Sequence, residues 1–220
     1  MESGLEVGTD IAVVTCVDAI RNQQWSEYPR MMPSFYKRLL GRTARQAVTL
    51  QDAELVTFPI VRALVNRYEV SIVDFGCGLA QQSRALAEYL RDATVRVRLT
   101  LIDISTLHRD FLLQWGRRAG ISTTFLRCTA GTPVLEWPEC DLCLAVEFFE
   151  QVHDPVSYFN RMDAKLTMGG LLVTGIMDQR RDFMRPSPQL GMVRKRIEEC
   201  GYETVVRERI LRKGHCHATN

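Results

Sequence analysis

The sequence has little that would place it in a membrane, outside the cell or on a polyanion. Its longest apolar runs are far shorter than the roughly 20 residues that a membrane-spanning helix needs. The first twenty residues include several acidic side chains and lack the basic start of a secretory signal. Lys and Arg number 28 against 26 Asp and Glu, and this small excess does not by itself indicate nucleic acid binding. We therefore expect a cytoplasmic protein without a membrane span.

The cysteines lack the pattern of a disulfide framework or a metal site. Their number, seven, is odd, and no short-spaced framework links them. Cys140 and Cys143 have the spacing of a metal or redox pair, but no second pair complements them and both lie in or beside a predicted buried strand. We interpret them as packing thiols, expect free thiols in a reducing compartment, and predict no metal site.

Length and hydrophobic pattern divide the chain into two parts. With 220 residues, 46% of them hydrophobic, the chain is long enough to bury a core without disulfides. Residues 1–66 look helical and irregular, and we expect an N-terminal helical cap that forms a substrate lid. Residues 67–220 alternate between apolar runs and helical patterns and are expected to form the core domain. A basic stretch, residues 30–45, is either a solvated helix face or a contact for an anionic substrate or RNA.

The core pattern predicts an α/β fold. Six strands are expected at residues 70–75, 95–104, 122–127, 141–146, 171–177 and 202–211, and helices at residues 81–91, 107–118, 154–166 and 190–200. Glycines 169 and 170 are expected to end the third of these helices. Strands that alternate with helices indicate a Rossmann-like, parallel-rich sheet with helices on both faces.

Residues 74–78, Asp-Phe-Gly-Cys-Gly, follow the first strand and are the most informative segment. Glycines between a strand and a helix permit a tight turn and the close approach of a ligand. A dinucleotide site would need a third glycine where Gln81 stands, and the Gly-Lys-Ser/Thr of a phosphate loop is absent. Asp74 would repel phosphate but attract a cation. Asp103, which ends the second strand, can accept hydrogen bonds from ribose hydroxyls. Together these acids predict S-adenosylmethionine, which carries two cationic groups and a ribose.

Several motifs in the same order resemble the class I S-adenosylmethionine-dependent methyltransferases, in the branch of ubiquinone-biosynthesis and small-molecule enzymes. They are the glycine turn, the ribose acid, the fourth strand with its acid (141–147), the helix start at 150–155 and the turn before the fifth strand (165–173). The resemblance assigns these residues to the cofactor: Asp74, Gly76, Cys77, Gly78, Asp103, Ile104, Thr129, Ala130 and Glu147.

The chain departs from the family pattern at three places. Ala80 replaces the third small residue of the glycine motif, and Thr129 stands where the family often has an acid that reaches adenine. Only residues 214–220 remain for the family's antiparallel seventh strand, which is therefore expected to be short or absent.

The resemblance also places candidate catalytic and substrate residues. His153 is the candidate general base because it titrates near neutral pH, and Glu150 is a second candidate. The predicted substrate contacts are Tyr28, Tyr36, Phe148 and Arg181. Each has a structural alternative: capping or salt bridging for the catalytic pair, core packing for Phe148 and a solvated loop for Arg181.

These features predict methyl transfer to the O, N or C atom of a small molecule, with S-adenosylmethionine as cofactor. The alternatives are an RNA or protein methyltransferase, or a catalytically silent subunit with this fold that activates a partner. The cofactor acids argue against the silent subunit, and the sequence after the fourth strand lacks the Asn/Asp-Pro-Pro-Tyr/Phe of base methyltransferases. We expect a monomer or homodimer that does not bind nucleic acid.

Overall fold

The computed structural model describes residues 59–128, 136–146, 148–175, 188–206 and 209–214. The chain divides into two compact units, Met1–Leu55 and Val56–Asn220, and the first lies outside the described residues. Residues 59–64 are helical, and Ile60, Val61 and Leu64 are buried. The predicted division into a cap (1–66) and a core (67–220) stays a prediction. Within the described ranges, no helix is long and apolar enough to cross a membrane.

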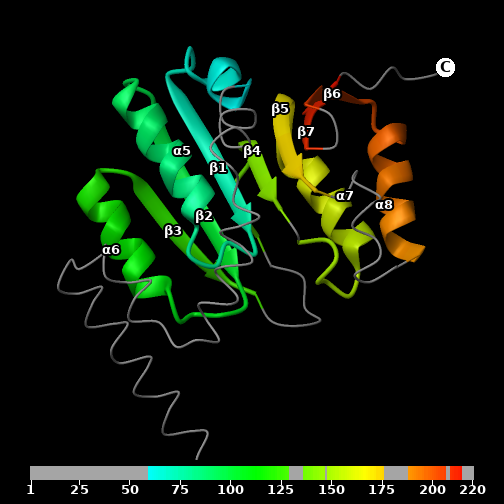
Figure 1. Cartoon of the computed structure of the whole chain (residues 1–220), viewed down its shortest axis with the longest axis horizontal. Helices are drawn as coiled ribbons and strands as arrows, with labels where there is room; N and C mark the ends of the chain where they lie inside the picture. The colour runs from blue at the N-terminus through cyan, green and yellow to red at the C-terminus, as the bar shows by residue number, and fades with distance from the viewer. Residues whose placement is uncertain (1–58, 129–135, 147, 176–187, 207–208, 215–220) are drawn as a thin grey trace, which may run out of the picture. The chain divides into compact units, whose positions relative to one another are not determined.

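The second unit is built on one sheet with the strand order β3-β2-β1-β4-β5-β7-β6 (Figure 1). Its strands are β1 (Glu69–Phe75), β2 (Arg96–Asp103), β3 (Ser122–Arg127), β4 (Cys140–Ala145), β5 (Leu166–Thr174), β6 (Tyr202–Val206) and β7 (Ile210–Lys213). β3, β2, β1, β4 and β5 pair in parallel, and β7 pairs antiparallel with both β5 and β6. The predicted parallel-rich α/β sheet is confirmed.

Helices cover both faces of this sheet. They are α5 (Gln81–Asp92), α6 (Arg109–Ala119), α7 (Pro155–Lys165) and α8 (Pro188–Glu199). Successive side chains of a strand point to opposite faces. Val73 and Phe75 of β1 belong to a core cluster that includes residues of α7 and α8, whereas Asp74 between them bonds to α5. Figure 1 accordingly shows α5 and α6 beside the β1–β3 half of the sheet, and α7 and α8 beside the β5–β7 half.

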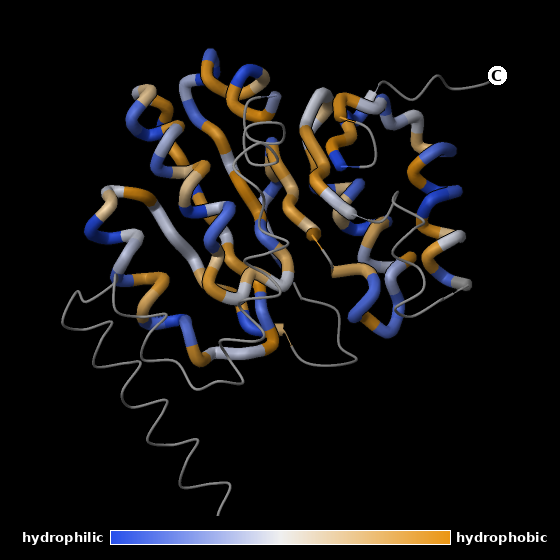
Figure 2. The backbone as a smooth tube through the Cα atoms, in the orientation of Figure 1, coloured by the Kyte–Doolittle hydropathy of each residue, from blue (hydrophilic) through white to orange (hydrophobic). Residues whose placement is uncertain are grey.

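Hydrophobic burial holds these layers together. Most of β1, β4 and β5 is apolar and buried, and Figure 2 shows the hydrophobic colour concentrated on the central strands. At the amino edge of the sheet the Asp141 carboxylate connects three strands. It accepts hydrogen bonds from the Ser71 amide (2.9 Å) and the Thr167 hydroxyl (3.2 Å), and it pairs with Arg67. This edge lies opposite the carboxyl ends of β1 and β2, where the ligand residues were predicted.

The C-terminal strands differ from the sequence-based prediction. Residues 202–211 were predicted to form one strand, which is wrong: they include β6 and the start of β7, and the Arg209 amide bonds back to the Val206 carbonyl (3.1 Å). The expected short seventh strand is therefore β7, at 210–213 rather than beyond 214. Lys213 of β7 forms an ion pair with Asp163 of α7 (3.2 Å), which fixes the hairpin to the helix layer.

The start of β5 also differs from the prediction. Helix α7 ends at Lys165, and the strand begins at once with Leu166, so Gly169 and Gly170 lie inside β5 rather than in a turn before it. Gly169 has φ +72°, and the β4–β5 register shifts between Cys140 and Leu142. The glycines therefore form a bulge, which glycine tolerates because it lacks a Cβ atom.

Candidate functional site

The turn between β1 and α5 has the backbone conformation that its glycines predicted. Gly76 (φ +65°) and Gly78 (φ +50°) both occupy the left-handed region. The amides of Gly76 and Cys77 donate to the Ile102 carbonyl of β2 (2.8 and 3.2 Å), which holds the turn against the neighbouring strand. A Cβ atom on Gly76 would lie 3.4 Å from the Phe148 ring, an ordinary contact, so the positive φ is what favours glycine there. The turn is thus a fixed, close-packed backbone surface.

Ala80 is the departure from the family's glycine pattern, and the structure shows its cost. It is the N-cap residue of α5 with φ 51° and ψ 36°, a left-handed conformation that disfavours residues with a Cβ atom by roughly 1–2 kcal/mol. Its amide donates to the Cys77 carbonyl (2.6 Å), and its side chain is buried. The backbone conformation makes Ala80 a strained position.

Asp103 ends β2 beside this turn, and both of its carboxylate oxygens are already fixed. Oδ2 accepts from the Gly78 amide (2.8 Å), and Oδ1 accepts from the Ser105 amide (2.8 Å). A carboxylate offers about four acceptor positions, so each oxygen keeps one for a ligand hydroxyl. The next residue, Ile104, is 62% exposed, an apolar side chain open to a ligand at the same end of the strand.

Asp74 lies at the end of β1 on the α5 side of the sheet and is buried. Its Oδ2 accepts a hydrogen bond from the Ser83 hydroxyl of α5 (2.6 Å). Burial raises the pKa of Asp74 to about 7; the Ser83 hydrogen bond opposes that rise and the negative charge of Asp103 adds to it. The sequence analysis missed Ser83, although a serine on the buried face of an amphipathic helix was a detectable signal.

The thiols and the histidine near the turn are poor candidates for acid–base or nucleophilic chemistry. Burial raises the pKa of Cys77, and the nearby Asp74 and Asp103 raise it further, so the thiol is neutral at physiological pH. Burial also raises the pKa of Cys128. Burial lowers the pKa of His108, the N-cap residue of α6, and the negative charge of Asp103 opposes that decrease. Cys77 therefore contributes its backbone to the turn rather than a thiolate.

Phe148, after the end of β4, packs over the glycine turn. Its ring centroid lies 5.3 Å from Phe75, 5.8 Å from Phe149 and 5.1 Å from Tyr158. Phe148 and Phe149 are both buried, with Phe149 only 1% exposed. Both rings therefore pack in the core, as the alternative for Phe148 proposed. A substrate contact for Phe148 stays a prediction.

The candidate catalytic residues precede α7. His153 is exposed, and Glu150 is partly buried. Asp154, not His153, caps the helix: its Oδ1 accepts from the Ser157 amide (3.0 Å), with Pro155 at the first helical position. His153 is therefore not required for capping, and its role as a base stays a prediction.

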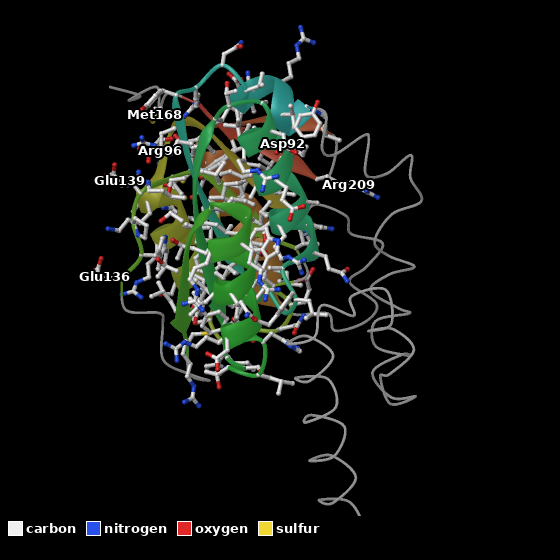
Figure 3. The ribbon with its side chains drawn as sticks, turned by 90° about the vertical axis from the view of Figure 1, so that its left-hand side faces the viewer. Asp92, Arg96, Glu136, Glu139, Met168 and Arg209 are labelled. Carbon is white, nitrogen blue, oxygen red and sulfur yellow. The ribbon has the colours of Figure 1, made fainter. Side chains whose placement is uncertain are left out.

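The remaining predicted residues lie outside the described part of the chain: Tyr28, Tyr36, Thr129, Ala130, Glu147 and Arg181. Within the described part, no group of three or more His, Cys, Asp or Glu side chains could hold a metal ion. Figure 3 shows Asp92, Arg96, Glu136 and Glu139 pointing outward from the fold. Of the described residues, those that converge on one place are Asp74, Ser83, Asp103 and the glycine turn.

Residues 73–174 match the family described as the methyltransferase domain. The matched stretch is 102 of the 220 residues, and it is similar to that family. The match begins within β1, one residue before Asp74, and ends with β5, so it contains Asp74, Ser83 and Asp103.

Solved structures show the same fold as the methyltransferase domain. A protein from Listeria monocytogenes, assigned to the class I S-adenosylmethionine-dependent methyltransferases, is 17% identical with a TM-score of 0.55; the match covers 76% of this chain and 60% of that one. A further S-adenosylmethionine-dependent methyltransferase, from Clostridium acetobutylicum, is 13% identical (TM-score 0.48; 64% and 56% covered). Coclaurine N-methyltransferase, bound to N-methylheliamine and S-adenosylhomocysteine, is 19% identical (TM-score 0.45; 58% and 36% covered).

At 17% identity and a TM-score of 0.55, the likeness to the Listeria protein shows the class I methyltransferase fold and nothing finer. The chain spans 60% of the length of the Listeria protein and 36% of the length of coclaurine N-methyltransferase. No curated protein matches the chain.

Proposed function

We propose that this chain binds S-adenosylmethionine at the glycine turn and transfers its methyl group to a small-molecule acceptor. The observation that carries the proposal is the Asp103 carboxylate, held by the Gly78 and Ser105 amides directly beside a turn with two left-handed glycines. The match of residues 73–174 to the methyltransferase domain supports it.

The site residues fit the parts of this cofactor. The two oxygens of Asp103 would accept the ribose hydroxyls, and exposed Ile104 would pack against the adenine ring. Asp74 would face the ammonium group of the amino acid part, because a carboxylate attracts a cation across a short distance in a buried site. The backbone of the glycine turn would lie against the chain that joins these two ends, where a Cβ atom would obstruct it.

When bound, S-adenosylmethionine supplies a methyl group on a positively charged sulfur. That methyl group would pass to an electron pair on an acceptor O, N or C atom, with S-adenosylhomocysteine as the other product. The protein aligns the acceptor with that carbon and excludes water, which contributes up to about 7–11 kcal/mol in favourable cases. His153 or Glu150 would remove a proton where the acceptor must lose one, a contribution of about 10²–10⁴-fold.

Isothermal titration calorimetry with S-adenosylmethionine and S-adenosylhomocysteine tests the cofactor. We expect binding of both at micromolar concentration and no binding of NAD, whose pyrophosphate Asp74 repels. Absence of binding to either sulfur compound would overturn the proposal. Transfer of a radiolabelled methyl group, measured against pools of small molecules, RNA and proteins, then tests the acceptor class; label that appears only in RNA or protein would refute the small-molecule part.

A further inference from the structure

The Ser83 hydroxyl lies in the core between two acceptors. Ser83 is the third residue of α5 and is fully buried. Its Oγ lies 2.6 Å from Asp74 Oδ2 and 3.3 Å from the Ala80 carbonyl oxygen. A hydroxyl has a single proton to donate, and 2.6 Å is within the range of a hydrogen bond to an ionised oxygen, roughly 2.5–2.7 Å. The proton is therefore directed at Asp74.

The other titratable groups around Asp74 do not favour its charge. Asp103, on β2, repels the ionised form. Cys77 of the turn and Cys143 of β4 also interact with Asp74, and burial keeps both thiols neutral by raising the pKa of each. Among the residues that the structure describes, the Ser83 hydroxyl is the group that stabilises the Asp74 carboxylate against burial.

We propose that Ser83 is a positioning residue of the cofactor site, whose hydroxyl keeps the Asp74 carboxylate ionised and oriented toward the ammonium group of S-adenosylmethionine. This inference rests on the proposed function. Removal of the hydroxyl would leave a buried carboxylate without its donor, and such a group takes up a proton instead of remaining charged. A protonated Asp74 has no net charge to attract an ammonium group, so cofactor affinity would fall although no atom that contacts the cofactor has changed.

The proposal predicts a characteristic dependence on pH. The Asp74 carboxyl is charged above its pKa of about 7 and neutral below it, so affinity for an ammonium ligand rises as the pH rises through 7. Without the Ser83 hydroxyl the same rise occurs at higher pH, since a lost hydrogen bond to the ionised form raises the pKa of a carboxyl. The ligand's own amino group also titrates, but it does so identically for every variant.

Calorimetry with S-adenosylhomocysteine at pH 6 to 8.5 tests the proposal on the full chain. We expect Ser83→Ala to bind about fivefold or more weakly than the wild type at pH 7, from the loss of a hydrogen bond to a charged group, and the gap to narrow at pH 8.5. Ser71→Ala is the matched control. Ser71 is also a buried serine and lies in β1, the strand that carries Asp74, but its Oγ lacks a hydrogen-bond partner in the described structure. Ser71→Ala should bind like the wild type.

A second ligand separates a specific effect from general damage. 5′-Methylthioadenosine keeps the adenine and ribose but lacks the amino group, so Ser83→Ala should bind it as the wild type does. An equal loss of affinity for both ligands, or an unchanged affinity and pH profile for S-adenosylhomocysteine, would overturn the role of Ser83. A wild-type protein that fails to bind S-adenosylhomocysteine at every pH would instead overturn the proposed function itself.

Discussion

Asp74→Asn should stabilise the fold while it damages the cofactor site. Burial raises the pKa of Asp74 from an ordinary value near 4 to about 7. Between these two values the unfolded chain has an ionised Asp74 and the folded chain keeps the proton. The folded state therefore binds more protons, and the free energy of unfolding falls as the pH rises from about 4 to about 7. Above pH 7 the folded state bears the full free-energy cost of burying an ionised Asp74. Asparagine has nearly the same shape, can still accept from Ser83, and carries no charge to desolvate.

The size of the effect follows from the pKa. Each tenfold step of acidity corresponds to about 1.4 kcal/mol, so a rise from about 4 to about 7 corresponds to about 4 kcal/mol at most. Asp74 is 9% exposed, so we expect partial hydration and a stabilisation of about 2–4 kcal/mol for Asp74→Asn at pH 8. At pH 4.5 the difference between the two proteins should shrink to less than about 1 kcal/mol.

Urea unfolding followed by tryptophan fluorescence measures this difference. Trp115 and Trp137 are both buried and report on the loss of the core. Curves are measured for both proteins at pH 4.5, 6, 7 and 8. The difference between the two proteins at each pH excludes the contributions of the other titrating groups, because both proteins contain them. A difference in unfolding free energy that stays constant over this range would refute the assignment of Asp74 as a buried carboxyl with a raised pKa. So would a wild type whose stability rises relative to the variant as the pH rises.

Three further predictions concern the same site. Asp103→Ala should weaken S-adenosylhomocysteine binding by more than about tenfold in calorimetry, since it removes the acceptor for ribose and for the Gly78 amide; near-normal affinity would mean that the ribose contact is misassigned. Ala80→Gly should raise the free energy of unfolding by about 0.5–1 kcal/mol, as relief of the left-handed strain exceeds the added chain entropy, and a lower urea midpoint would contradict it. His153→Gln should lower turnover by about 10²-fold or more if His153 is the base, and unchanged turnover with a labelled acceptor would exclude that role.

The parts of the site that depend on local sequence were predictable. Glycines 76 and 78 permit the positive φ that a tight turn needs, and Asp103 ends a strand whose neighbour in the parallel sheet leads into the turn. Both features come from short-range pattern plus one rule of topology, that the carboxyl ends of parallel strands share an edge. The prediction of an α/β sheet succeeded for the same reason.

The features that were missed depend on backbone conformation and side-chain contacts that the residue pattern does not specify. The role of Ser83 comes from its hydrogen bond to Asp74, nine residues earlier in the chain. The strain at Ala80 comes from the turn in which its amide donates to the Cys77 carbonyl. The reversal between β6 and β7 was overlooked because residues 202–211 contain no glycine, proline or asparagine, the residues that usually mark a turn. Pairing of β7 with β5 on one side and β6 on the other decides that reversal.

The fixed carboxylate of Asp103 has a kinetic consequence. Both of its oxygens accept hydrogen bonds from backbone amides, and the turn that supplies one of those amides is itself bonded to β2. A ligand that docks on such a preformed acceptor does not wait for a rearrangement of these groups, so encounter sets the association rate. Variants of the ribose contact should therefore bind at nearly the wild-type speed and differ in how long the complex lasts.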